Sequence, residues 1–203
     1  MLDFHISYWK LLDRSYWFGT GRTERHAMSD TPQAPKFETY RFADDGIVPN
    51  NAALPLVVYR GALADSGDRA AACERMFAQN GWGGGWRNGI YADHHYHSTA
   101  HEALGIARGS ARVRLGGAGG PVVALNAGDV VVIPAGVAHK REAASRDLLV
   151  IGAYPRGQHP DMCRAEPAEH DRALANIAAV ALPEADPVTG RADPLRLCWR
   201  EAP

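Results

Sequence analysis

Between positions 89 and 154, apolar residues recur in short runs that are separated by glycine. The runs are rich in valine and isoleucine, and several alternate with polar residues: GIYADHHYH, EALGIARG, ARVRLGG, PVVALNAG, DVVVIPAG, AHKRE and DLLVIGAY. A period of two is typical of half-buried strands, and about seven short strands this close together indicate an antiparallel sandwich or barrel. GGAGG is expected to form a hairpin turn. This part of the chain therefore predicts a mostly β protein.

The flanking segments predict two helices and two further strands. Residues 68–79 are rich in alanine and end at Asn80-Gly81, a helix stop, and 167–180 has an amphipathic pattern, so each predicts a helix. LPLVVYRG suits a strand, and LRLCW, residues 195–199, suits a last strand. GWGGGW is expected to be flexible and to be anchored by its two tryptophans.

The first 36 residues do not share these patterns. Residues 1–36 are predicted to be an N-terminal extension, either disordered or added upstream of a natural start at Met28, because SDTPQAP directly follows that methionine. The alternative is a short amphipathic arm that packs on a partner. Residues 37–203 are expected to form one domain.

Composition excludes several classes of partner. The chain is 46% hydrophobic and 22% charged, which is ordinary for a globular protein. A net charge of −1 gives no basic field for nucleic acid or for an anionic membrane, and no apolar run is long enough for a membrane span. The three cysteines form no CxxC motif, so we expect a reducing, cytoplasmic location without disulfides.

The chemistry is concentrated in HHYHSTAHE, residues 94–102, which holds four of the nine histidines. If 89–97 is a strand, His95 and His97 share one face, whereas His94 points to the other. Glu102 begins the next strand and reaches the same place. Imidazole and carboxylate both bind a divalent metal at about 2.0–2.2 Å, so three ligands converge on one ion. His139 is the remaining histidine of the β region and the candidate fourth ligand.

Two motifs in this region resemble those of the cupin superfamily, whose fold is the RmlC-like jelly roll. The first is carried by Gly89, His95, His97, Glu102 and Gly109, and the second by Gly128, Pro134, Gly136 and His139. Ala143 stands where the second motif usually has asparagine. The motifs cover residues 89–143, and 18 residues lie between them. FADDGIVPNN, NGWGGGWRNGIY, GAYP and DPVTG extend the resemblance, over roughly 38–199, to the YjlB-like cupins, a bacterial group of unassigned activity.

The resemblance implies a jelly-roll β-barrel that holds one divalent metal ion on His95, His97, Glu102 and His139. On an octahedral ion this set leaves two positions open, and it suits Fe, Mn, Ni, Co or Zn. Further candidates for a catalytic role lie nearby in the sequence. They are Tyr91 and Asp93, on the ligand face of the expected strand, and His101, beside Glu102.

Three classes of function follow from this reading. The favoured one is a metal-dependent enzyme with a small-molecule substrate, a dioxygenase if the metal is iron and an isomerase or lyase if the metal is redox-inert. The alternative is a non-catalytic sensor of a small molecule or metal. The third is an oligomerisation module. VVVIP is apolar on both faces, so its second face is expected to meet a second sheet or a subunit, which supports a homodimer.

Overall fold

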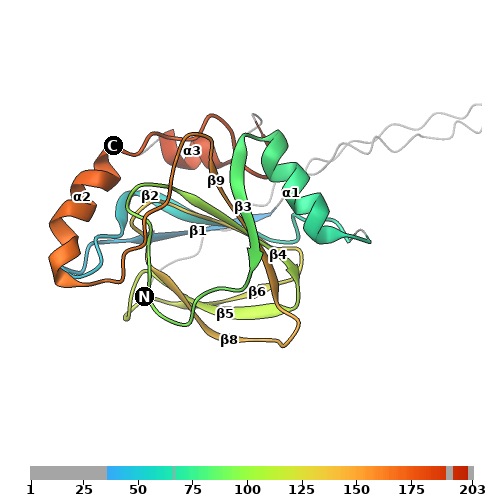
Figure 1. Ribbon diagram of the computed structural model, residues 1–203, viewed down its shortest axis with the longest axis horizontal. Coiled ribbons are helices and arrows are strands. Elements are labelled where there is room, and N and C mark those ends of the chain that lie inside the picture. The colour runs from blue at the N-terminus through green and yellow to red at the C-terminus, as the bar shows by residue number, and fades with distance from the viewer. Residues whose placement is uncertain (1–35, 66, 191–193, 201–203) are drawn as a thin grey trace, which may run out of the picture. The chain divides into compact units, whose positions relative to one another are not determined.

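The computed structural model describes residues 36–65, 67–190 and 194–200, all in the unit Ala34–Pro203 (Figure 1). The predictions for the first 35 residues lie outside this part. In it the chain forms nine strands, three α-helices and a 3₁₀ helix. These are β1 (Phe37–Phe42), β2 (Asn51–Tyr59), α1 (Arg69–Gln79), β3 (Trp82–Asn88), β4 (Glu102–Arg108), β5 (Ser110–Leu115), β6 (Val122–Asn126), β7 (Val130–Ile133), β8 (His139–Ala144), β9 (Leu149–Pro155), the 3₁₀ helix (Pro167–Glu169), α2 (His170–Ala179) and α3 (Pro194–Arg200).

The strands form two antiparallel sheets with one core between them. The larger sheet has the order β1-β2-β7-β4-β9-β3, and the smaller has the order β6-β5-β8. Alternate residues of both sheets meet in one buried cluster, which includes Leu56, Leu104, Val113, Leu125 and Ile133. The predicted mostly β jelly roll is confirmed, and GGAGG is the hairpin turn between β5 and β6.

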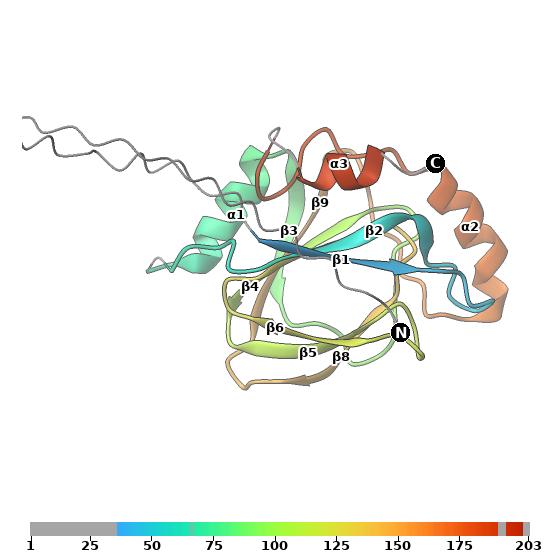
Figure 2. The same ribbon diagram turned by 180° about the vertical axis from the view of Figure 1, so that it is seen from behind.

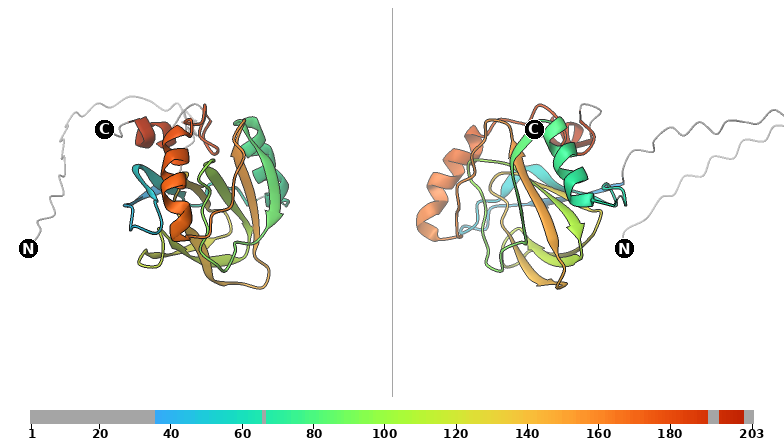
Figure 3. Two further views of the ribbon diagram at one scale, coloured as in Figure 1. Left: turned by 60° about the vertical axis from the view of Figure 1, so that its left-hand side comes forward. Right: turned by 45° about the vertical axis from the view of Figure 1, so that its right-hand side comes forward.

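The opposite face of the larger sheet is buried too. On β7, Val131 and Ile133 point into the core between the sheets, whereas Val130 and Val132 belong to a second cluster. The chain's own helices cover that cluster. Helix α1 contacts β3, β4 and β9, and α3 contacts β2 (Figures 2 and 3). A strand buried on both faces has a continuous apolar run. The second face of VVVIP therefore needs no partner subunit, and the homodimer stays a prediction.

The helices start and stop where the local sequence allows. The Asp68 carboxylate accepts a hydrogen bond from the backbone N–H of Ala71 at 3.0 Å and caps α1, which lies within the range predicted for it. Helix α2 follows the 3₁₀ turn at Pro167–Glu169 and ends one residue before the predicted bound. None of the helices in the described ranges is long and apolar enough to cross a membrane.

Two predictions of local structure outside the histidine-rich segment were wrong. LRLCW is not a strand but lies in α3, where Leu195 and Trp199 are buried and Leu197 is 64% exposed. A spacing of four puts the two buried residues on one helix face, whereas a strand would have placed all three together. GWGGGW is not a loop, because all of it except Gly81 belongs to β3, which pairs with β9 at the edge of the larger sheet with an irregularity between Gly83 and Trp86.

Candidate metal centre

The histidine-rich segment before β4 is irregular, so the prediction of a strand over 89–97 was wrong. It makes only two isolated bridges among the described residues, His95 with His139 and Tyr96 with Cys163. Its neighbours belong to different elements, so no continuous ladder forms. As predicted, His95 and His97 nevertheless point to one side of the chain and Tyr96 to the other. His95 and His97 line a cavity, whereas Tyr96 is buried in a separate cluster.

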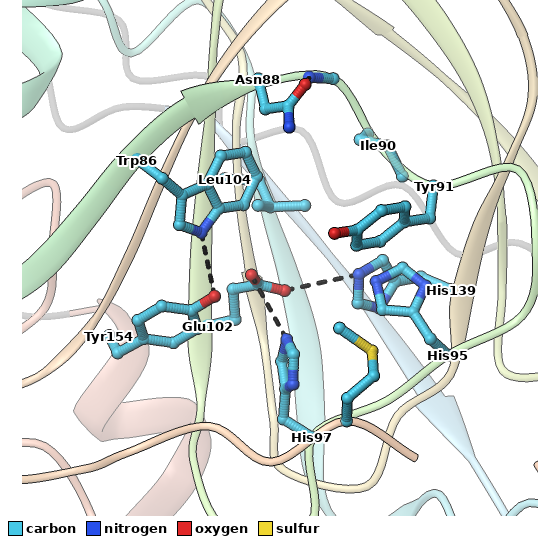
Figure 4. A pocket seen from close by; sticks show the side chains of 12 residues that line it. Trp86, Asn88, Ile90, Tyr91, His95, His97, Glu102, Leu104, His139 and Tyr154 are labelled. Atoms are coloured by element: carbon cyan, nitrogen blue, oxygen red, sulfur yellow. Dashed lines mark hydrogen bonds and ion pairs between the residues drawn. The ribbon is translucent and has the colours of Figure 1, made fainter. Parts of the chain in front are cut away.

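That cavity, of about 290 Å³, brings the four predicted ligands together (Figure 4). His95 and His97 come from the irregular segment, Glu102 begins β4, and His139 begins β8. The turn before β8 needs Gly136, whose φ is +92° and whose N–H donates to the His97 carbonyl oxygen at 2.8 Å. The two motifs thus meet through backbone hydrogen bonds as well as through the cavity.

Backbone carbonyl groups orient all three imidazoles. His95 Nδ1 is 3.1 Å from the carbonyl oxygen of Asp93 and His139 Nδ1 is 3.4 Å from that of Val137. His97 Nδ1 makes a short hydrogen bond to the carbonyl oxygen of Asp161. With the proton on Nδ1, each Nε2 keeps a free lone pair, which is the usual arrangement around a metal-binding histidine.

The donor atoms fit a divalent metal. Glu102 is 3% exposed, and its Oε2 atom has no hydrogen-bond partner among the described residues. The Nε2 atoms of His97 and His139 lie 3.5 and 3.4 Å from its two oxygens. Two neighbouring ligands of one ion, each at about 2.1 Å, are about 3 to 3.4 Å apart. In the described ranges, no three His, Cys, Asp or Glu side chains stand in a ready-made metal-holding arrangement.

Burial and mutual charge set the protonation of the cluster. Burial lowers the pKa of His139 to about 3 and also lowers the pKa of His95, so both rings are neutral, as metal binding requires. Burial opposes the charged form of His97, but the contacts with Glu102 and with Asp161 together outweigh burial and raise the pKa of His97. Burial likewise opposes ionisation of Glu102. The hydrogen bond with His97 and the nearby imidazoles together outweigh burial, so the pKa of Glu102 is lowered. Glu102 is therefore an anion facing nitrogen donors.

Of the three further candidates, the structure brings only the Tyr91 side chain to the cavity. Tyr91 is 53% exposed, and its ring stands edge-on to that of His95, with centroids 5.1 Å apart. Asp93 contributes its backbone carbonyl, and its side chain is exposed outside the lining. His101 is turned away, because its ring packs on Trp199 at 4.7 Å and its Nδ1 accepts from the N–H of Ala135.

Other residues of the cavity were not among the predicted site residues. Tyr154 and Met162 complete its walls with Trp86, whose Nε1–H donates to the Tyr154 hydroxyl oxygen at 2.9 Å. Trp86 lies opposite Gly152 across β3 and β9, and a Cβ at Gly152 would come within 2.1 Å of the tryptophan ring. Trp86 and Gly152 pair only because Trp86 lies in strand β3. The sequence did not predict that strand, because the glycines before Trp86 are unusual in a strand.

A loop after β9 fixes the position of His97. The Asp161 carboxylate accepts hydrogen bonds from the backbone N–H groups of Ser98 and Thr99, at 2.6 and 3.3 Å, and a short one from the Ser98 hydroxyl. Asn176 of α2 donates to the same hydroxyl oxygen at 2.8 Å. Nothing in the local sequence around Asp161 signals this role, because its partners in the histidine-rich segment, Ser98 and Thr99, are distant in the chain.

Comparisons with solved structures give weak likenesses. An oxalate decarboxylase from Bacillus subtilis aligns with 65% of this chain at 16% identity and a TM-score of 0.32. Procruciferin, an 11S globulin of Brassica napus, aligns with 66% at 15% identity and a TM-score of 0.33. The chain spans 28% of the length of each.

The sequence comparisons are stronger. The cupin domain family model matches residues 87–151, which include all four candidate ligands. A Bacillus subtilis (strain 168) protein, described as uncharacterized protein YjlB, is 43% identical over 162 residues, which are 80% of this chain and 96% of that protein. The chain belongs to the cupin superfamily and, within it, to the YjlB-like group.

Proposed function

We propose that this protein binds one divalent metal ion through His95, His97, Glu102 and His139, and that it acts on a small molecule in the adjoining cavity. The buried Glu102 carboxylate carries the proposal, because one of its oxygens lacks a hydrogen bond and lies near an imidazole nitrogen. Leaving a buried anion so poorly paired is costly unless a cation completes the site.

The metal would supply Lewis acidity, and with iron also redox chemistry toward O₂. The chain's own residues do the rest. Leu104 and Trp86 give the cavity apolar walls that limit water beside the ligands. The Tyr154 oxygen accepts from Trp86, so its own O–H is free to donate toward Glu102, and burial followed by the charge of Glu102 raises the pKa of this hydroxyl. Dioxygenase chemistry with iron, or isomerase or lyase chemistry with a redox-inert metal, is the activity we propose.

One observation favours the alternative, a sensor without turnover. Glu102 is the only carboxylate among the residues that line the cavity, and no lysine or free histidine stands beside it. A reaction that needs proton transfer would have to use Tyr91 or Tyr154. The two functions separate experimentally, because a sensor shows ligand-dependent thermal stabilisation without product, whereas an enzyme consumes its ligand. The homodimer and the cytoplasmic location stay predictions.

The first experiment is elemental analysis by mass spectrometry of untagged protein purified without chelator. We expect near one equivalent of a divalent metal in the wild type and a sharp loss in His97→Ala and in Glu102→Ala. His159→Ala is the matched control, since His159 is exposed and outside the cavity. Iron would support the dioxygenase, and manganese, nickel, cobalt or zinc would support the isomerase or lyase. Unchanged metal content in both ligand variants would contradict the assignment.

A further inference from the structure

We propose that the ligand of this cavity is a small ring compound with oxygen donors at one end and an uncharged hydrogen-bond acceptor at the other. The oxygen donors would face Glu102 and the histidines, and Asn88 would bind the acceptor. This inference rests on the proposed function in one respect, namely that the metal occupies the inner end.

The shape of the cavity favours a flat ligand of ring size. Its volume of about 290 Å³ is at the lower end of what small-molecule sites offer, about 300–1,000 Å³. The Trp86 ring forms one wall and is held on both sides, by the hydrogen bond to Tyr154 and by close contact with Gly152. Leu104 and Ile90 add aliphatic surface. A rigid aromatic wall packs best against another ring.

The charges of the lining argue against a second anionic group on the ligand. None of the residues that line the cavity is lysine or arginine. The guanidinium of Arg164 lies 5.6 Å from the centroid of the Tyr91 ring, but Arg164 does not belong to the lining. A carboxylate or phosphate remote from the metal would lose part of its hydration when the opening is covered. Arg141 and Arg146 line only the neighbouring pocket, so no cation of this lining would pair with it, which is unfavourable.

The polar group at the outer end is a donor. Asn88 Oδ1 accepts a hydrogen bond from the N–H of Gly89 at 2.9 Å, which fixes the amide and leaves its NH₂ group free. Figure 4 shows the amide nitrogen turned toward the cavity. An NH₂ group binds carbonyl, amide or hydroxyl oxygens. Tyr91 and Met162, 53% and 42% exposed, border the opening and would be covered when such a ligand binds.

Two isosteric probes test the inference by titration calorimetry. 3,4-Dihydroxybenzamide and 3,4-dihydroxybenzoate share the same oxygen donors and ring, and they differ in one charge at the far end. We expect the amide to bind at least tenfold more tightly than the acid. Asn88→Ala should weaken binding of the amide about tenfold, which corresponds to about 1.4 kcal/mol, and Asn126→Ala, exposed on β6 outside the cavity, should leave it unchanged. Because Asn88 is itself exposed, its variant keeps the fold intact.

Metal content measured on the same samples separates the two proposals. If the protein as purified contains no metal, binding of the amide that still depends on Asn88 would uphold the role of the cavity and of Asn88 and contradict the proposed metal at the inner end. In metal-containing protein, binding of the acid as tight as that of the amide, equal effects of Asn88→Ala and Asn126→Ala, or no binding of either probe would overturn the ligand class alone.

Discussion

At the scale of single residues, Asp161 shows how a loop outside the sheets controls a ligand. Its carboxylate holds the backbone of Ser98 and Thr99, and its own carbonyl accepts from His97. Groups that orient a metal ligand typically contribute 10- to 100-fold to metal affinity. Asp161 therefore acts through His97 and is a positioning residue.

Asp161→Ala should lower metal affinity by about ten- to a hundredfold, because the loop that presents His97 loses its acceptor. Competition with a chromogenic chelator measures this. Asp171→Ala, on the exposed face of α2, serves as the control. Asp161→Asn keeps one acceptor oxygen and should recover part of the affinity. Equal affinities in the wild type and Asp161→Ala would rule out the positioning role.

Gly105 illustrates a close approach between β4 and α1. A Cβ at this position would come within 2.3 Å of the Cys73 Sγ atom. Gly105→Ala should therefore lower the free energy of unfolding by about 1–3 kcal/mol, the usual cost of overpacking. Cys73→Ala in the same chain should recover part of the loss. Urea denaturation of both single variants and the double variant checks this, and strictly additive effects would contradict it.

The motif spacing predicted that four side chains would meet, and the structure brings His95, His97, Glu102 and His139 to one cavity, although only Glu102 and His139 begin strands. It was not sufficient for the walls. His101 was a candidate through its neighbour Glu102, yet consecutive residues of an extended chain point to opposite sides, and His101 faces Trp199. Tyr154 and Met162 reach the cavity through tertiary contacts that no local pattern encodes.

At the scale of elements, a buried carboxylate joins α3 to the larger sheet. Asp186 is fully buried and accepts hydrogen bonds from the N–H groups of Val188 and Thr189, at 2.7 and 3.1 Å. It also accepts from the N–H of Leu195, in the first turn of α3, and from the Tyr59 hydroxyl of β2. A carboxylate at a helix start is favourable. Asp186 therefore links helix α3 to strand β2 of the larger sheet.

Asp186→Ala should reduce the free energy of unfolding by about 2–4 kcal/mol, because several buried donors lose one shared acceptor. Chemical denaturation followed by circular dichroism measures it. Asp147→Ala is the control here, since its side chain is exposed. A loss no larger than that of the control would show that solvent replaces the Asp186 contacts.

Strands within the barrel were easier to predict than the elements that cover it. Short apolar runs identified β4 to β7 and β9, because each of these strands contributes residues to the core between the sheets. LRLCW was misassigned because five residues fit both periods, and only the burial of Leu195 and Trp199 decides for a helix. The glycines of β3 lower strand propensity, and pairing with β9 overrides that local preference.

At the scale of the whole molecule, an ion pair ties α2 to the segment after β1. His170 Nε2 lies 2.9 Å from Asp44 Oδ1. Hydrogen bonds to Asp44 and then to Asp171 raise the pKa of His170. A histidine whose pKa is higher in the folded state than in the unfolded state stabilises the fold. This contribution is complete at pH values below the unfolded-state pKa of about 6.5, and it is lost as the pH rises through the folded-state pKa.

His170→Gln should therefore destabilise the protein more at pH 5.5 than at pH 8.5. Midpoints of urea unfolding at both values, for the wild type and the variant, measure the difference. His159→Gln provides a control on a second exposed histidine. A difference that grows toward pH 8.5 would have the wrong sign.

Removal of the proposed metal should be visible in global stability. A ligand that binds only the folded state stabilises it by about 2.7 kcal/mol at a free concentration 100 times its Kd. Thermal unfolding should thus shift downward after dialysis against chelator and recover when metal is restored. Glu102→Gln should show a much smaller shift of the unfolding temperature on chelation. An equal shift in the wild type and the variant would show that the metal responsible binds outside the proposed site.

Met162 and Asp161 lie in a segment that makes only one isolated bridge, Tyr96–Cys163, to the rest of the described β structure. In evolutionary terms, the scaffold and the entrance are therefore separable. A substitution of Met162 changes the opening of the cavity without removing a hydrogen bond between strands. The site is then preserved as long as Asp161 keeps its hydrogen bond to the backbone of Ser98. Loops carried by a rigid framework are where new specificities arise at low cost to folding. Divergence of ligand preference among relatives should accumulate around this loop before it touches the strands.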